Sequence, residues 1–382
     1  ATGLMMYGLL FSRGLLSSGM ISMISNVVLN KRIGYWLKQY FTDVVLLCFT
    51  LIFFSRVLSA FNSSPTNFLM DRLRIWLPFL ILPFGFVVMK KMPAQFVRLL
   101  LIYFLLMMTA ECCWLLIHNL QTNNSLYSIG HTIQTPFSHI RFSLMIAMCV
   151  MIGVALLRMK FVQIHVAEKW MIGACTIFLF AFMHWLAVRR GLLALYVCMM
   201  IWIVIEIYKS KNKKVGLAAL GIFITSILIA FSVVPSLKSK MGYMRYDLQQ
   251  FFVGGNPTQL SDASRVLSMQ YGLQLFKQLP LIGTGIGNLK KDMSAMYTAY
   301  PDMPAEKRFP HNQFVYVLAS GGIIGFMIFC YGIFTPLIYR RNFKRMLFLM
   351  FYVIALSSFF TEATLEEQMG TGFFCVFGLL LY

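Results

Sequence analysis

The hydrophobic positions of this chain fall into long runs that short polar clusters separate. Each run approaches the length that a helix needs to cross the hydrocarbon core of a bilayer. Lipid admits only helices or closed barrels, and these runs exceed the roughly 10 residues of a barrel strand. The pattern therefore predicts an all-α polytopic membrane protein with about twelve transmembrane helices, whose rough limits are 1–12, 14–29, 43–60, 75–89, 97–118, 142–158, 170–187, 191–208, 215–235, 312–338, 346–361 and 370–382.

Composition and charge agree with a membrane protein and orient it. The 382 residues are 59% hydrophobic and only 12% charged, whereas soluble domains are nearer a quarter charged. Short basic clusters mark the cytoplasmic side, here NKRIGYWLK, KKMP, KSKNKK and YRRNFKR. Alternation of the spans then places three segments outside: 61–74, 121–141 and the long polar segment 236–310. We expect an N-terminal transmembrane bundle (1–235), one large outer loop (236–310) and C-terminal transmembrane helices (311–382).

Arginines gather on the predicted outer side, where topology gives no reason for them. A guanidinium pairs bidentately with phosphate oxygens, so an anionic ligand such as a lipid-linked pyrophosphate fits, as does attraction to anionic headgroups. Arg189 and Arg190 lie between two spans with almost no loop, so they are either partly buried against an anionic partner or a snorkelling pair. The outer set is Arg13, Arg56, Arg72, Arg74, Arg141, Arg189, Arg190, Arg245, Arg265 and Arg308.

His311 is the leading candidate for a reacting group. It follows Pro310, which suits a helix start, at the outer edge of span 312–338. A neutral imidazole there can take a proton as a general base, and Asn312 could orient a sugar hydroxyl or the imidazole. The alternative is an interfacial histidine in a capping role. The glycines of SGGIIGF, just downstream, permit close approach of another helix.

Other polar positions are less specific. His139 lies beside Arg141 and could line the same cavity, while Glu111, inside a span, is either functional or held in an interhelical pair. GTGIG at 283–287 lacks a strand–helix context, so it predicts a tight turn rather than a nucleotide loop. Without a cysteine–histidine cluster of ligand spacing, we expect no zinc site, and we expect no cofactor.

Two stretches together resemble the O-antigen ligase and polymerase family: SDASRVLSMQYGLQLFKQLPLIGTGIGN with FPHNQFVYVLASGGIIGF, and VRRGLLALY. In that pattern a loop Ser-Arg precedes a proline and a GxG turn, and a His-Asn then opens a span. The resemblance implies a GT-C-type glycosyltransferase of the bacterial inner membrane, working at the periplasmic face without a metal. His311 matches the motif histidine that activates the acceptor, and Arg265 and Arg189 match arginines expected at the pyrophosphate. Arg190 stands where the family has a small polar residue, so both neighbouring arginines stay candidates.

The expected reaction is inverting transfer of a glycan from undecaprenyl pyrophosphate to lipid A-core, as in O-antigen ligases. His311 would act as base, and Arg189, Arg190 and Arg265 would neutralise the leaving group. Additional substrate or acceptor contacts are expected from Arg72, Arg74, His139, Arg141, Arg308 and Asn312. An O-antigen polymerase or a protein O-oligosaccharyltransferase would use the same chemistry. A lipid-linked glycan transporter is the alternative of another class, but it predicts inverted repeats and broken helices, neither of which the sequence shows.

Overall fold

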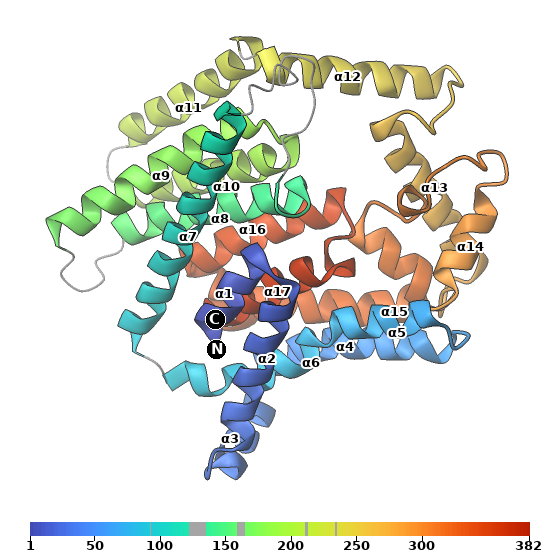
Figure 1. The fold of residues 1–382 in the computed structure, drawn as a ribbon, viewed down its shortest axis with the longest axis horizontal. Coiled ribbons are helices and arrows are strands. Elements are labelled where there is room, and N and C mark those ends of the chain that lie inside the picture. Colours follow the sequence, from blue (N-terminus) through green and yellow to red (C-terminus); the bar gives the residue numbers. More distant parts are fainter. Residues whose placement is uncertain (92, 122–134, 159–164, 211–212, 234) are drawn as a thin grey trace. The chain divides into compact units, whose positions relative to one another are not determined.

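The computed structural model describes residues 1–91, 93–121, 135–158, 165–210, 213–233 and 235–382. Every regular element in these ranges is a helix (Figure 1). The chain forms two compact units, one of residues 1–97 and 250–382 and the other of residues 98–249. Helices α7 (Ala94–Gln121) and α12 (Pro235–Phe252) each begin in one unit and end in the other. Each unit is described below by itself.

The first unit contains both ends of the chain. Its first half comprises α1 (Thr2–Phe11), α2 (Arg13–Val28), α3 (Ile33–Thr42), α4 (Val44–Phe61), α5 (Asn67–Trp76), α6 (Pro78–Phe86) and the 3-10 turn η1 (Val88–Lys91). Its second half comprises α13 (Ser261–Gln278), α14 (Leu289–Met296), η3 (Ala305–Lys307), α15 (Gln313–Ile338), η4 (Tyr339–Lys344), α16 (Met346–Thr361), η5 (Thr364–Glu366) and α17 (Gln368–Leu380).

Short polar side chains fix where the apolar helices of the first unit begin. Asp43 accepts hydrogen bonds from two backbone N–H groups at the start of α4. Thr66 accepts one hydrogen bond, from the backbone N–H of Leu69, at the start of α5. Asn312 caps α15 by accepting from the N–H groups of Phe314 and Val315. Such caps satisfy donors that have no partner inside the helix, so the sequence sets these boundaries locally.

Helix α15 packs along α4, as Figure 1 shows. The contact is close because glycines on α15 face the backbone of α4. A Cβ added at Gly332 would lie 2.9 Å from the carbonyl oxygen of Cys48, and one at Gly325 would lie 3.8 Å from that of Ser55. Small residues allow this approach in membranes, and the expectation that the SGGIIGF glycines admit a second helix is confirmed.

Helix α15 is interrupted at Gly322, which has φ 60° and ψ −166°. Segment 280–285 fills the break and adopts positive φ at Gly283 and Gly285. Four backbone hydrogen bonds join them: Ile323 N to Pro280 O at 2.8 Å, Ile324 N to Leu281 O at 3.2 Å, Thr284 N to Ala319 O at 3.0 Å and Gly285 N to Ser320 O at 3.0 Å. The GTGIG stretch is thus the tight turn that its context predicted. The break at Gly322 is not evident in the sequence, and the backbone groups that it frees bond to the chain itself.

Residues 261–310, part of the predicted outer loop, contain two helices, α13 and α14. A buried cluster joins α13, α14 and the first turns of α15, with Leu267, Leu275, Leu289, Met293, Tyr297, Met303, Tyr316 and Ala319 as its members. Burial raises the pKa of the Tyr297 phenol, and the nearby Arg308 partly opposes the shift. This core holds α13 against α15 and so fixes the loop around His311.

The second unit is built on α8 (His139–Arg158), which packs against both α9 (Val166–Leu186) and α10 (Arg189–Lys209), while α10 also contacts α11 (Lys213–Val233). A Cβ at Gly153 would lie 1.9 Å from the hydroxyl oxygen of Thr176, so only glycine lets α9 approach there. Arg98 pairs with Glu168, and Arg158 pairs with Glu206 at 3.0 Å.

The helices agree with most of the predicted spans. Six of the described helices are long and apolar enough to cross a membrane: Val44–Phe61, Ala94–Gln121, His139–Arg158, Val166–Leu186, Arg189–Lys209 and Gln313–Lys344. Thr2–Phe11, Met346–Thr361 and Gln368–Leu380 are shorter apolar helices. The chain is a multi-pass membrane protein, as predicted. The number of twelve spans and the three-part division stay predictions, and much of the predicted outer segment 121–141 lies outside the described residues.

Candidate functional site

His311 lies one residue before the N-cap of α15. Because the Asn312 side chain caps the helix, the capping role considered for His311 belongs to its neighbour. The His311 backbone N–H donates to the hydroxyl of Ser268 on α13 at 3.3 Å. Helix α13 and the start of α15 therefore both hold the histidine backbone, and its ring is left to make other contacts.

The His311 ring meets a carboxylate that the sequence reading did not single out. Its Nδ1 lies 2.7 Å from Oε2 of Glu362, with 18% of the histidine side chain and 15% of the glutamate side chain exposed. An ionised carboxylate only accepts hydrogen bonds, so Nδ1 carries the proton and Nε2 is the basic nitrogen of the neutral ring. In the part of the chain that the structure describes, no hydrogen-bond partner occupies Nε2. The pair has the arrangement of a general base with an orienting acid.

Three consecutive residues join the start of α15 to segment 360–366. Besides the His311 bond, the Asn312 amide donates to the carbonyl oxygen of Phe360 at 3.1 Å. The fully buried Gln313 makes two further bonds. Its Nε2 donates to Glu366 Oε1 at 3.1 Å, and its Oε1 accepts from the Leu365 N–H at 2.8 Å.

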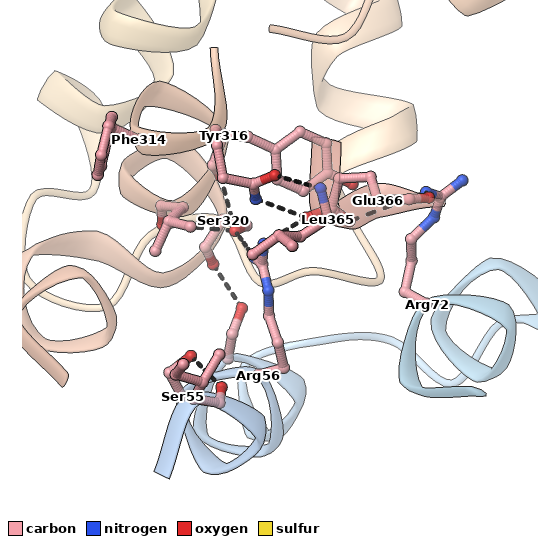
Figure 2. Close-up of polar contacts among 12 residues, drawn as sticks. Ser55, Arg56, Arg72, Phe314, Tyr316, Ser320, Leu365 and Glu366 are labelled. Carbon is pink, nitrogen blue, oxygen red and sulfur yellow. Dashed lines mark hydrogen bonds and ion pairs between the residues drawn. The ribbon is translucent and has the colours of Figure 1, made fainter. Parts of the chain in front are cut away.

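Glu366 anchors this segment to two further helices (Figure 2). Its carboxylate pairs with Arg56 of α4, a side chain only 1% exposed. Arg72 of α5 donates to the Glu366 carbonyl oxygen at 2.7 Å and lies 3.8 Å from the carboxylate. Arg56 also donates to the Ser320 hydroxyl at 2.8 Å and stacks over the Trp76 ring at 4.0 Å. Two of the predicted outer arginines thus have a carboxylate of the same chain as their partner.

The other predicted arginines of the first unit differ in their surroundings. Arg265 on α13 lies 3.2 Å from Asp262 and is partly exposed, and its carbonyl oxygen accepts a bond from Ser268, the residue that binds the His311 backbone. Arg308 donates to the carbonyl oxygens of Met303 and Pro301, and these bonds stabilise the loop before α15. Arg74 lies 3.8 Å from Asp71 on the exposed face of α5.

Four of the predicted site residues lie at the starts of two helices in the second unit. Arg189 and Arg190 form the first turn of α10, and Arg141 lies buried in the first turn of α8, which begins at His139. A Cβ at Gly191 would lie 2.4 Å from the Ser143 hydroxyl oxygen, so the two first turns lie side by side. Cations at a helix N-terminus oppose the helix dipole, so these positions do not serve helix stability. They suit an anion, which helix N-termini also favour.

Glu111 is buried in α7. Neither a hydrogen bond nor an ion pair of its carboxylate occurs among the described residues. The interhelical pair proposed for it is therefore not found in these ranges.

Comparison with known families adds an independent observation. Residues 174–330 match the family model of O-antigen ligases. The resemblance seen in the sequence is confirmed. The matched segment of this O-antigen ligase family includes Arg189, Arg190, Arg265 and His311 and ends before Glu362. No curated protein matches the chain. The match supports a glycosyltransferase-like function of O-antigen ligase or polymerase type in lipopolysaccharide biosynthesis, in the bacterial inner membrane, with a lipid-linked glycan as partner.

The sequence reading missed Glu362, Gln313 and Glu366. One signal was present: TEATLEEQMG lies between two apolar runs and places three acids between 362 and 367 in a chain that has 13 acids and a net charge of +20. Acidic residues at the end of a span predict a functional or paired site. Which basic groups they pair with could not be read from the pattern.

Proposed function

We propose that this protein is an O-antigen ligase, which transfers an undecaprenyl-pyrophosphate-linked glycan to lipid A-core with inversion at the anomeric carbon. The observation that carries the proposal is the His311–Glu362 pair, whose Nδ1 and Oε2 atoms are 2.7 Å apart. The histidine lies just before α15, the helix in which the matched family segment ends. A histidine whose Nδ1 is held by a carboxylate presents Nε2 as a base. The site would face the periplasm, in a GT-C-type membrane fold.

The reaction follows from these groups. Nε2 of His311 takes the proton of the acceptor hydroxyl while that oxygen attacks the anomeric carbon. The bond from this carbon to the diphosphate oxygen breaks, and its electron pair leaves with undecaprenyl pyrophosphate. The imidazolium that forms lies against the Glu362 carboxylate, which stabilises it. Afterwards the proton passes to water or to the released diphosphate, which restores the neutral base.

The leaving diphosphate needs positive charge where its own charge develops. Arg189 and Arg190, which begin α10, are candidates for this charge because the family resemblance points to them and a guanidinium pairs with phosphate oxygens. Arg265 is the candidate in the first unit. The arginines provide this charge without requiring a metal ion.

The acceptor is the least constrained part of the proposal. A second undecaprenyl-linked glycan would make the protein a polymerase, and a Ser or Thr hydroxyl would make it a protein glycosyltransferase. We favour lipid A-core because the outer segments besides 236–310 are short. Arg74, exposed on α5, is the candidate for its core phosphates, whereas Arg72 and Arg308 already bind carbonyl oxygens of the chain.

One experiment tests both the chemistry and the acceptor. Purified protein in detergent is given undecaprenyl-pyrophosphate glycan with lipid A-core, with a second lipid-linked glycan or with an acceptor peptide, in separate reactions. We expect transfer to lipid A-core only. His311→Ala should abolish it, whereas His165→Ala, a histidine exposed at the N-cap of α9, should not change it. Parental transfer by His311→Ala would refute the assignment of the base.

A further inference from the structure

The His311–Glu362 pair lies where a loop meets a helix start, a place where side chains are usually mobile. Glu362 is the extended residue just after α16, with φ −152° and ψ 153°, and η5 after it is a single 3-10 turn. Its own secondary structure therefore does little to aim its carboxylate. A small shift of the backbone of segment 360–366 would move the carboxylate away from the imidazole, so the position of this segment matters for the pair.

The neighbouring Gln313 bonds to the same segment at two points. Its amide oxygen accepts from the Leu365 N–H and its amide nitrogen donates to the Glu366 carboxylate. These bonds tie the segment that carries Glu362 to the first residue of α15, two positions after His311. A fully buried amide with both of its ends bonded is also a rigid link, because water does not compete for its partners.

Glu366, at one end of this link, is held by positively charged side chains. Arg56 and Arg72 reach Glu366 from α4 and α5, and Figure 2 shows both side chains directed at it. Removing a buried ion pair in favour of apolar packing is often neutral or stabilising. Stability alone thus explains poorly why Arg56, Arg72 and Glu366 meet here. The three residues are better explained if they fix the position of segment 360–366.

We propose that Gln313, with Arg56 and Arg72 acting through Glu366, positions Glu362 against His311 and so sets the efficiency of the base. These are positioning residues, since they reach the reacting atoms only through the Glu362 carboxylate. The inference rests on the proposed glycosyl transfer. It adds a chain of contacts that runs from α4 and α5 through Glu366 and its loop to the His311 imidazole.

The test uses Gln313→Met, which keeps the side-chain volume and removes both bonds. The full-length protein is purified, and transfer from the lipid-linked glycan to lipid A-core is measured over a range of both substrates. We expect kcat to fall by about ten- to a hundredfold, the loss typical of a displaced catalytic group. Both KM values should stay within about twofold, because neither substrate contacts Gln313.

A double-mutant cycle with Glu362→Gln separates positioning from packing. If Gln313 acts through Glu362, Gln313→Met should slow the Glu362→Gln enzyme by no more than about twofold, because the path to the base is already cut. Equal fold losses in both backgrounds would overturn the inference. A parental rate for Glu362→Gln itself would instead refute the proposed base pair, so the two failures are distinguishable.

Two further variants guard against misfolding. Arg72→Gln changes a side chain that is 21% exposed. It should lower kcat by about two- to tenfold, the worth of one hydrogen bond, and its effect should likewise shrink in Glu362→Gln. Asn342→Leu removes a buried amide that bonds the Pro336 carbonyl oxygen at the other end of α15, and it should leave kcat unchanged. Equal losses from Asn342→Leu and Gln313→Met would show that any buried amide matters, which would also overturn the inference.

Discussion

Replacing Glu362 by glutamine isolates the charge that we assign to the base pair. The amide oxygen of the glutamine still accepts a hydrogen bond from Nδ1 of His311, so the geometry is kept and only the negative charge is lost. In the parent the two atoms are 2.7 Å apart, and less than a fifth of either side chain is exposed. Solvent therefore screens the interaction little, and the carboxylate should stabilise the imidazolium as the proton arrives.

The size of the effect follows from this contact. A hydrogen bond to a charged group contributes about 1.5 to 3 kcal/mol. Each 1.36 kcal/mol in a barrier is tenfold in rate, so kcat should fall by about 10- to 150-fold. KM for donor and acceptor should change little, because the charge matters only once the proton has moved.

The assay is steady-state transfer of a labelled glycan from undecaprenyl pyrophosphate to lipid A-core by purified protein, with thermal unfolding as a check on folding. Glu367→Gln is the matched control, because it removes the same charge five positions away from an exposed side chain. We expect its kcat to equal that of the parent. If Glu362→Gln turned over at the parental rate while His311→Ala was inactive, the carboxylate would have no part in the chemistry.

Three other outcomes test the structure around the site. Arg56→Met leaves the buried Glu366 carboxylate without its closest partner and should lower the free energy of unfolding by about 3 to 5 kcal/mol; Arg56→Met with Glu366→Leu should recover much of that loss in thermal unfolding. Gly322→Ala puts a Cβ 2.4 Å from segment 280–285 at positive φ, so the free energy of unfolding should fall by about 1 to 3 kcal/mol from the backbone conformation alone. An unchanged unfolding temperature would mean that the break can straighten. Arg189→Gln and Arg190→Gln, measured separately, should show which arginine binds the diphosphate, through a loss in kcat/KM for the donor of about a hundredfold or more; parental values for both would remove the diphosphate from this end of the second unit.

The sequence by itself determined the helices and much of the local chemistry. Apolar runs of span length can only be helices in lipid, and the starts of α4, α5 and α15 follow from Asp43, Thr66 and Asn312, which cap the nearest N–H groups. The glycines at 283–287 indicated a tight turn, and those at 321–325 indicated close approach of another helix. These features were readable because each depends on residues a few positions apart.

Only the tertiary structure decided which groups face each other. His311 pairs with Glu362, 51 positions away, and Arg56 pairs with Glu366, 310 positions away. Helical periodicity says which face a side chain lies on, but the partner on that face depends on how distant helices pack. Arg56 and Arg72 looked like ligand-binding cations in the sequence because their partner, the Glu366 carboxylate, lies in a distant loop. Only the folded chain places that loop beside the two arginines.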